Sequence, residues 1–166
     1  MATTRLMPLH TGKGRTVGQA ISAIIDYTEN PQKTDGGRLV SPHGCDPATA
    51  AAEMLLTRRQ YLDAGGWVPG NDKEVLAYHI RQAFKPGEIT PEEANRVGYE
   101  TAMRWTKGKH AFFVATHTDR RHIHNHIYYN STALDCAHKY RDFFRSASAL
   151  RRLSDRVCIE HELSVI

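Results

Sequence analysis

Residues 116–130 read THTDRRHIHNHIYYN and hold four of the ten histidines in the chain. Within this stretch His122, His124 and His126 recur at every second position, and the apolar Ile123 and Ile127 occupy intervening positions of the same alternation. Alternate residues of a β-strand point to the same face. The stretch therefore predicts a strand with three imidazole rings on one face.

A second candidate strand, residues 111–117, precedes this one and ends in His117. Residues 118–121 can turn the chain back as a hairpin, which would set His117 beside His122 and His124. Imidazoles that converge from two adjacent strands suit a divalent metal, although imidazoles alone do not identify which metal. A purely structural role would require a hydrogen-bond partner for each buried ring.

The first part of the chain predicts a strand and two helices. Arg5–Leu9 is a short candidate strand, and Thr16 with Gln19 forms a capping box for a helix over residues 17–28. Residues 32–41 are polar and contain glycine, which is typical of a loop. Asp46-Pro47 predicts the start of a second helix that runs to about Ala64.

The remaining elements complete an α+β domain. Residues 75–84 alternate as a strand, with His79 and Arg81 on one face. Thr90-Pro91 begins a helix that Lys107–Lys109 closes, and residues 146–161 form the last helix. We expect a two-layer sandwich, with a central antiparallel sheet that carries the histidine cluster and helices packed mainly on one face.

Length and charge bound the class of protein. The chain has 166 residues, enough for one domain with a substantial core. It carries 22 Lys+Arg against 18 Asp+Glu, for a net charge of +4, which permits a nucleic-acid partner without proving one. The three cysteines are scattered and form no CxxC motif, which favours a reducing, cytoplasmic setting. No apolar run approaches a membrane span in length.

Two basic segments are candidates for contact with DNA phosphates. Lys13 and Arg15 lie in a glycine-bearing loop, residues 10–15, where backbone amides and cations can meet an anion. Arg151 and Arg152 lie in the last helix. A plain surface loop and a solvated helix face are the alternatives for these segments.

The histidine stretch resembles the metal motif of the HUH relaxases, and most closely that of the VirD2/MobA-like branch. The resemblance implies that His117, His124 and His126 bind a divalent metal, Mg²⁺ or Mn²⁺. It implies an accessory place for His122 and a role for Asp119 in orienting a ligand histidine. It also implies that residues 1–166 form the DNA-nicking domain and are an N-terminal fragment of a longer protein.

The segment IDYTENP, residues 25–31, resembles the part of these relaxases that carries the nucleophilic tyrosine. The resemblance therefore assigns the nucleophile to Tyr27. Tyr128 is a rival because it shares the predicted face of the histidines. Some relaxases of other branches use a histidine, for which His10 and His79 are the candidates.

A further segment, HIRQAFKPGE at residues 79–88, resembles the second motif of the family. Relatives often carry serine where Ala83 stands, so a hydroxyl-based role is not expected here. Glu88 is a candidate catalytic residue that tunes the metal site. Its alternative is an ordinary helix-start residue that interacts with the helix dipole.

The resemblance implies that the protein nicks and rejoins one DNA strand at a transfer origin through a 5′-phosphotyrosyl intermediate. Its expected partners are single-stranded origin DNA, accessory transfer proteins and a coupling ATPase. One alternative is a rolling-circle replication initiator, although such proteins generally carry the tyrosine after the histidines. Another is a non-catalytic DNA-binding module with a structural metal, which usually involves thiolates that are absent near these histidines.

Overall fold

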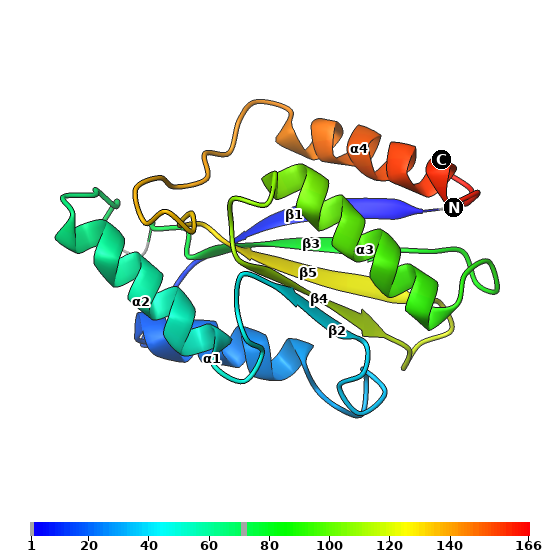
Figure 1. The fold of residues 1–166 in the computed structure, drawn as a ribbon, viewed down its shortest axis with the longest axis horizontal. Helices are drawn as coiled ribbons and strands as arrows, with labels where there is room; N and C mark the ends of the chain where they lie inside the picture. Colours follow the sequence, from blue (N-terminus) through cyan, green and yellow to red (C-terminus); the bar gives the residue numbers. More distant parts are fainter. Residues whose placement is uncertain (1, 71–72) are drawn as a thin grey trace.

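A five-stranded antiparallel sheet forms the centre of the molecule, as the computed structural model of residues 2–70 and 73–166 shows (Figure 1). Its strand order is β1-β3-β5-β4-β2, and every neighbouring pair is antiparallel. The strands are β1 (Thr3–Leu9), β2 (Val40–His43), β3 (Ala77–Ala83), β4 (Phe112–His117) and β5 (His124–Asn130).

Four helices pack around this sheet, and two of them cover one face. The helices are α1 (Val17–Thr28), α2 (Ala50–Asp63), α3 (Pro91–Thr106) and α4 (Ser146–Glu160). Figure 1 shows α3 and α4 side by side across the sheet, with α1 and α2 paired at one end of it. The predicted α+β class with a central antiparallel sheet is thus confirmed.

The two faces of the sheet bury different side chains. On the α3/α4 face, Ile127 and Tyr129 of β5 pack with Ala102 and Leu150. On the other face, Tyr128 packs with α1 and α2. This pair of helices adds a partial third layer over one end of the histidine-bearing face, and it is this layer that brings α1 to the site.

The N-terminal boundaries of α1 and α3 follow their capping residues closely. Thr16 and Gln19 make the reciprocal capping box of α1, and Thr90 and Glu93 make that of α3, with Pro91 in the first turn. The predicted start of α2 at Asp46 is wrong. The Asp46 carboxylate accepts a hydrogen bond from the Ala48 amide in a turn, and the helix begins only at Ala50.

Strand β2 overlaps the end of residues 32–41, for which the sequence predicts a loop. It has four residues, includes Pro42 and forms an edge through its pairing with β4 alone. Its short length and its proline hide the alternation that identifies longer strands.

The two ends of the described chain meet beside β1. Ala2 forms a parallel bridge with Val165, so the C-terminal segment closes against the first strand. Nearby in the chain, Lys139 forms an isolated antiparallel bridge with Thr132. Across the described ranges, no helix is both long enough and apolar enough to cross a bilayer.

Candidate metal centre and nucleophile

The β4–β5 hairpin brings together the three histidines predicted as metal ligands. His117 pairs directly with His124 across the hairpin, and His126 follows two residues later on the same face. One potential ligand atom from each of the three lies within 4.8 Å of the others, and all three side chains are buried. A strand pair sets this spacing through its backbone, so the cluster needs no loop to hold it.

Backbone carbonyls fix the protonation of two of these rings. His117 Nε2 lies 2.9 Å from the Thr28 carbonyl oxygen, and His124 Nδ1 lies 3.3 Å from that of His122. A carbonyl only accepts, so each of these nitrogens must carry the proton and donate. The other nitrogen of each ring therefore keeps a lone pair available to a metal.

His126 completes this pattern through a fourth histidine. His126 Nδ1 lies 2.9 Å from His79 Nε2, while its own Nε2 is buried and has no hydrogen-bond partner among the described residues. The His79 ring also stacks on Tyr128, at 4.2 Å between centroids. An unpartnered buried imidazole nitrogen costs free energy unless a ligand satisfies it. The donor set thus fits a divalent metal.

The cluster is held neutral, as metal ligation requires. Burial, together with the charges of neighbouring histidines and Arg81, lowers the pKa of His126 to about 2. Burial also lowers the pKa of His124 to about 4 and depresses that of His117. Neutral imidazoles are the form that binds metals.

Helix α1 places Tyr27 over the same cluster. The Tyr27 ring centroid lies 6.1 Å from that of His126 and 6.3 Å from that of His117. The Tyr27 side chain is 53% exposed. The helix itself is anchored in the core by Ile21 and Ile25. The adjacent Thr28 supplies the carbonyl that holds His117, so one helix end serves both the tyrosine and a histidine.

His79 and Lys33 belong to the site, although the sequence offered His79 only as a rival nucleophile and did not assign Lys33 at all. Strand parity set His79 on one face of its strand, but only the register of β3 against β5 reveals that it meets His126 and Tyr128. Lys33, from the loop after α1, lies with its Nζ 4.6 Å from the centroid of the Tyr27 ring. No sequence signal connected this loop lysine to the histidines.

Asp119 and His122 lie at the margin of the cluster. Asp119 Oδ2 is 3.7 Å from Lys33 Nζ, and its charge acts on His117, but it is the Thr28 carbonyl that bonds this histidine. The predicted role of Asp119 in orienting a ligand histidine stays a prediction. His122 stands 5.4 Å from His124 between ring centroids, outside the group of three, in keeping with an accessory place.

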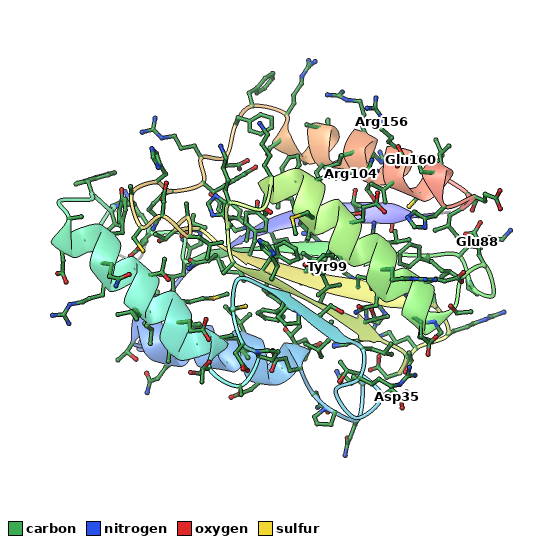
Figure 2. The ribbon with its side chains drawn as sticks, viewed as in Figure 1. Asp35, Glu88, Tyr99, Arg104, Arg156 and Glu160 are labelled. Carbon is green, nitrogen blue, oxygen red and sulfur yellow. The ribbon has the colours of Figure 1, made fainter. Side chains whose placement is uncertain are left out.

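Glu88 and the α4 arginines lie away from the histidines. Glu88 accepts a hydrogen bond from the Ser164 amide, and Figure 2 shows it near the C-terminal end of α4. The structure therefore does not bring Glu88 to the cluster, where it was expected. Arg151 and Arg152 are exposed on α4, over the opposite face.

The loop of Lys13 and Arg15 occupies a different position. Both residues are exposed. The loop joins β1 to α1, the helix that carries Tyr27. The rival nucleophiles also differ in place: His79 and Tyr128 lie beside His126, whereas His10 bonds the Glu74 carbonyl.

Comparison with known proteins yields consistent matches. A family model described as "Relaxase: MobA/VirD2-like, nuclease domain" matches residues 27–163. The chain is 34% identical over 165 residues to Protein rlx of Staphylococcus aureus, across 99% of this chain and 45% of that protein. It is 36% identical over 132 residues to the group II intron-interrupted relaxase LtrB of Lactococcus lactis subsp. cremoris, across 69% of this chain and 23% of that protein.

One solved structure shares the fold. It is described as "Molecular Basis of Vancomycin Resistance Transfer in Staphylococcus aureus" and matches with a TM-score of 0.55 at 12% identity, over 99% of this chain and 96% of that one. The chain spans less than half the length of the curated relatives it matches. With the family model covering most of its residues, the chain belongs to the MobA/VirD2-like relaxase family and carries its nuclease domain.

Proposed function

We propose that this domain cuts and rejoins one strand of DNA at a transfer origin, with Tyr27 as the nucleophile. The observation that carries the proposal is the position of Tyr27, whose ring lies within 6.3 Å of two of the three clustered histidines between centroids. The presence of the tyrosine on α1, before the histidines in the chain, favours a relaxase over a rolling-circle initiator.

His117, His124 and His126 would hold the metal, for which Mg²⁺ or Mn²⁺ is proposed. Once bound, such an ion polarises a phosphodiester and stabilises the charge that develops during attack. The chain's own contribution is to hold three neutral rings with lone pairs available. His79 and the Thr28 carbonyl do this by engaging the opposite nitrogens of His126 and His117.

Tyr27 then performs the covalent step. Its phenolic oxygen bonds to the scissile phosphorus, and the bond from phosphorus to the 3′ oxygen breaks. The phenol loses its proton, and the departing 3′ oxygen gains one. The products are a 5′-phosphotyrosyl strand and a free 3′ hydroxyl. Because one phosphodiester replaces another, the reverse reaction can rejoin the strand without ATP.

The wider setting of the reaction rests on the family alone. We propose that the full protein acts in the cytoplasm on single-stranded origin DNA, and that accessory transfer proteins and a coupling ATPase assist it. The named relatives extend well beyond the length of this chain. Their remaining segments are the place where such contacts would be made.

A nicking assay tests the proposal. The protein is incubated with end-labelled single-stranded DNA from a cognate transfer origin and Mn²⁺ or Mg²⁺, and adducts are separated in denaturing gels. Wild type and Tyr61→Phe, a control on α2, should form a covalent adduct, whereas Tyr27→Phe should form none. Metal binding without any adduct in the wild type would instead favour a non-catalytic DNA-binding module.

A further inference from the structure

Two arginines lie in line with the histidine cluster on the same face of the sheet. Arg81 of β3 pairs directly with His126 of β5, and Arg5 of β1 pairs directly with Arg81. Directly opposed residues in a sheet share a face. One row of cross-strand neighbours therefore runs from the edge strand to the metal ligands, in the order Arg5, Arg81 and His126.

The contacts of neighbouring residues confirm this orientation. His79, two residues before Arg81 on β3, contacts His126 and Tyr128. Alternate residues share a face, so Arg81 also projects toward the histidine side. Ala83 continues this side of β3, between Thr3 and His124. Its side chain is a single methyl group, which adds little bulk beside Arg81.

Both arginines are exposed and lack partners within the described chain. No ion pair or side-chain hydrogen bond joins Arg5 or Arg81 to another described residue. On the opposite side of the sheet the pattern differs. There Arg104 of α3 forms ion pairs with Glu100 and Glu160, and Figure 2 shows it beside Glu160 of α4. Arg81 and Arg5 thus leave positive charge open to an external anion.

The charge of Arg81 reaches the cluster. Arg81 is the direct cross-strand partner of His126, so its charge lies on the strand next to two of the clustered histidines. A cation held close to neutral ligands without a carboxylate to offset it weakens the binding of any metal there. Such an arrangement is favourable when the bound substrate is itself an anion.

We propose that Arg81 and Arg5 bind successive phosphates of the DNA strand on one side of the scissile bond. The inference rests on the proposed function, since it takes the scissile phosphate to lie at the three histidines. Adjacent strands are about 4.8 Å apart, so Arg5 stands about 10 Å from β5, measured between backbones. The guanidinium forks of both residues suit phosphate oxygens. The DNA would therefore cross β5, β3 and β1 on the histidine face.

The test measures binding without cleavage. Affinity of the whole chain for a fluorescent single-stranded oligonucleotide is followed by anisotropy in EDTA over a series of salt concentrations. Arg81→Ala and Arg5→Ala should each reduce the slope of log affinity against log salt by about 0.7, the value for one phosphate of a single strand. Arg96→Ala, which removes an exposed charge from α3 on the opposite face, is the matched control and should leave the slope unchanged.

A second arm identifies the phosphates. Oligonucleotides with one neutral methylphosphonate at each position near the cleavage site should weaken wild-type binding at two adjacent positions. The affinity of Arg81→Ala should not change with one of these methylphosphonate substitutions, and the affinity of Arg5→Ala should not change with the other. If Arg81→Ala does not fold, Arg81→Gln, which keeps much of the side-chain length, serves in its place.

The outcomes separate this inference from the proposed function. The phosphate track means the proposed contacts of Arg81 and Arg5 with successive phosphates. Equal slopes for Arg81→Ala, Arg5→Ala and Arg96→Ala would overturn this phosphate track even if wild type forms the covalent adduct. A reduced slope with no adduct would support the track while rejecting the nuclease chemistry. Failure of the wild type to bind single-stranded DNA in EDTA would also overturn the track.

Discussion

His126 is the residue on which the site depends most. Its Nδ1 meets His79, and its buried Nε2 meets no partner in the described chain. A buried polar atom left in this way destabilises the fold by about 1–3 kcal/mol unless something binds it. The fold keeps that atom at a point where two more rings offer lone pairs, which is the arrangement expected of a metal site.

Replacement of single histidines should lower the affinity for metal by different amounts. His126→Ala removes a ligand and should abolish Mn²⁺ binding in the micromolar range. His79→Phe removes only the partner of His126 Nδ1 and should weaken binding by about 10- to 100-fold. His122→Ala should change it least. Isothermal titration with Mn²⁺ would measure these affinities, and a larger loss from His122→Ala than from His117→Ala would contradict the assigned ligand set.

At this scale the sequence predicted which histidines would meet but not how each is oriented. Period-two spacing was sufficient to place His124 and His126 on one face. The Thr28 carbonyl and His79 were out of reach, because their positions depend on how α1 docks and on the register between β3 and β5. Alternation in β3 gives the face of His79, and only the paired sheet supplies its neighbour.

At the scale of elements, the hairpin and α1 carry the site, while α3 fixes the sheet from behind. Gly98 of α3 lies against β4 and β5, and a Cβ there would strike the Asn125 amide and lie 2.8 Å from Val114 Cγ1. Asn125 Nδ2 donates to the Ala94 carbonyl and to Gln82 Oε1, so it cannot move without loss of buried hydrogen bonds. The glycine thus allows the helix to approach closely.

Gly98→Ala should therefore destabilise the domain by about 1–3 kcal/mol, through overpacking. Its control is Gly18→Ala in α1, where a Cβ would make an ordinary contact of 3.4 Å with Leu55. Since alanine is the better helix former by about 1 kcal/mol, this change should be neutral or stabilising. Urea unfolding followed by circular dichroism would compare them. Equal stability of the two variants would refute the close packing of α3.

The end of α1 should make stability depend on pH. Burial, with the charges of Asp26 and Asp46, raises the pKa of Glu29 from its ordinary 4.5 to about 7. The folded state thus holds a proton that the unfolded state releases, and this contribution is complete below pH 4.5 and is lost as pH rises through about 7. Glu29→Gln should raise the melting temperature above wild type at pH 8 and lose this advantage near pH 4. A constant difference across this range would contradict the prediction.

Helix and strand identity was largely accessible from sequence because local signals agreed with the packed structure. Capping boxes marked α1 and α3, and alternation marked β3 and β5. The signals failed where the element was short or its start ambiguous. Strand β2 has four residues and depends on β4 for its definition, and Asp46 caps a turn before α2 begins.

At the scale of the whole molecule, the sheet separates two surfaces. One carries the histidines and Tyr27, while α3 and α4 cover the other. The loop with Lys13 and Arg15 leads into α1 and so belongs with the first surface, whereas Arg151 and Arg152 belong with the second. Both basic segments were predicted to contact DNA, and their separation makes the prediction testable segment by segment.

For single-stranded DNA, Lys13→Ala or Arg15→Ala should reduce the salt dependence of binding by about 0.7 in slope each. Arg151→Ala and Arg152→Ala should have a smaller effect, because a strand on the histidine face does not reach α4. Anisotropy titrations at several salt concentrations measure both. If the α4 variants showed the larger change, DNA would have to lie over the face opposite the histidines.

The central claim is that Tyr27 attacks a phosphate held at the histidine cluster, and mass spectrometry of the trapped adduct tests it most directly. Wild-type protein is incubated with cognate single-stranded DNA and Mn²⁺, denatured and digested with protease and nuclease, and the modified peptide is sequenced. The account predicts a nucleotide on the peptide that contains Tyr27, joined through its phenolic oxygen, and no modified peptide from Tyr27→Phe. A nucleotide on Tyr128, His79 or His10, or undiminished adduct from Tyr27→Phe, would contradict it.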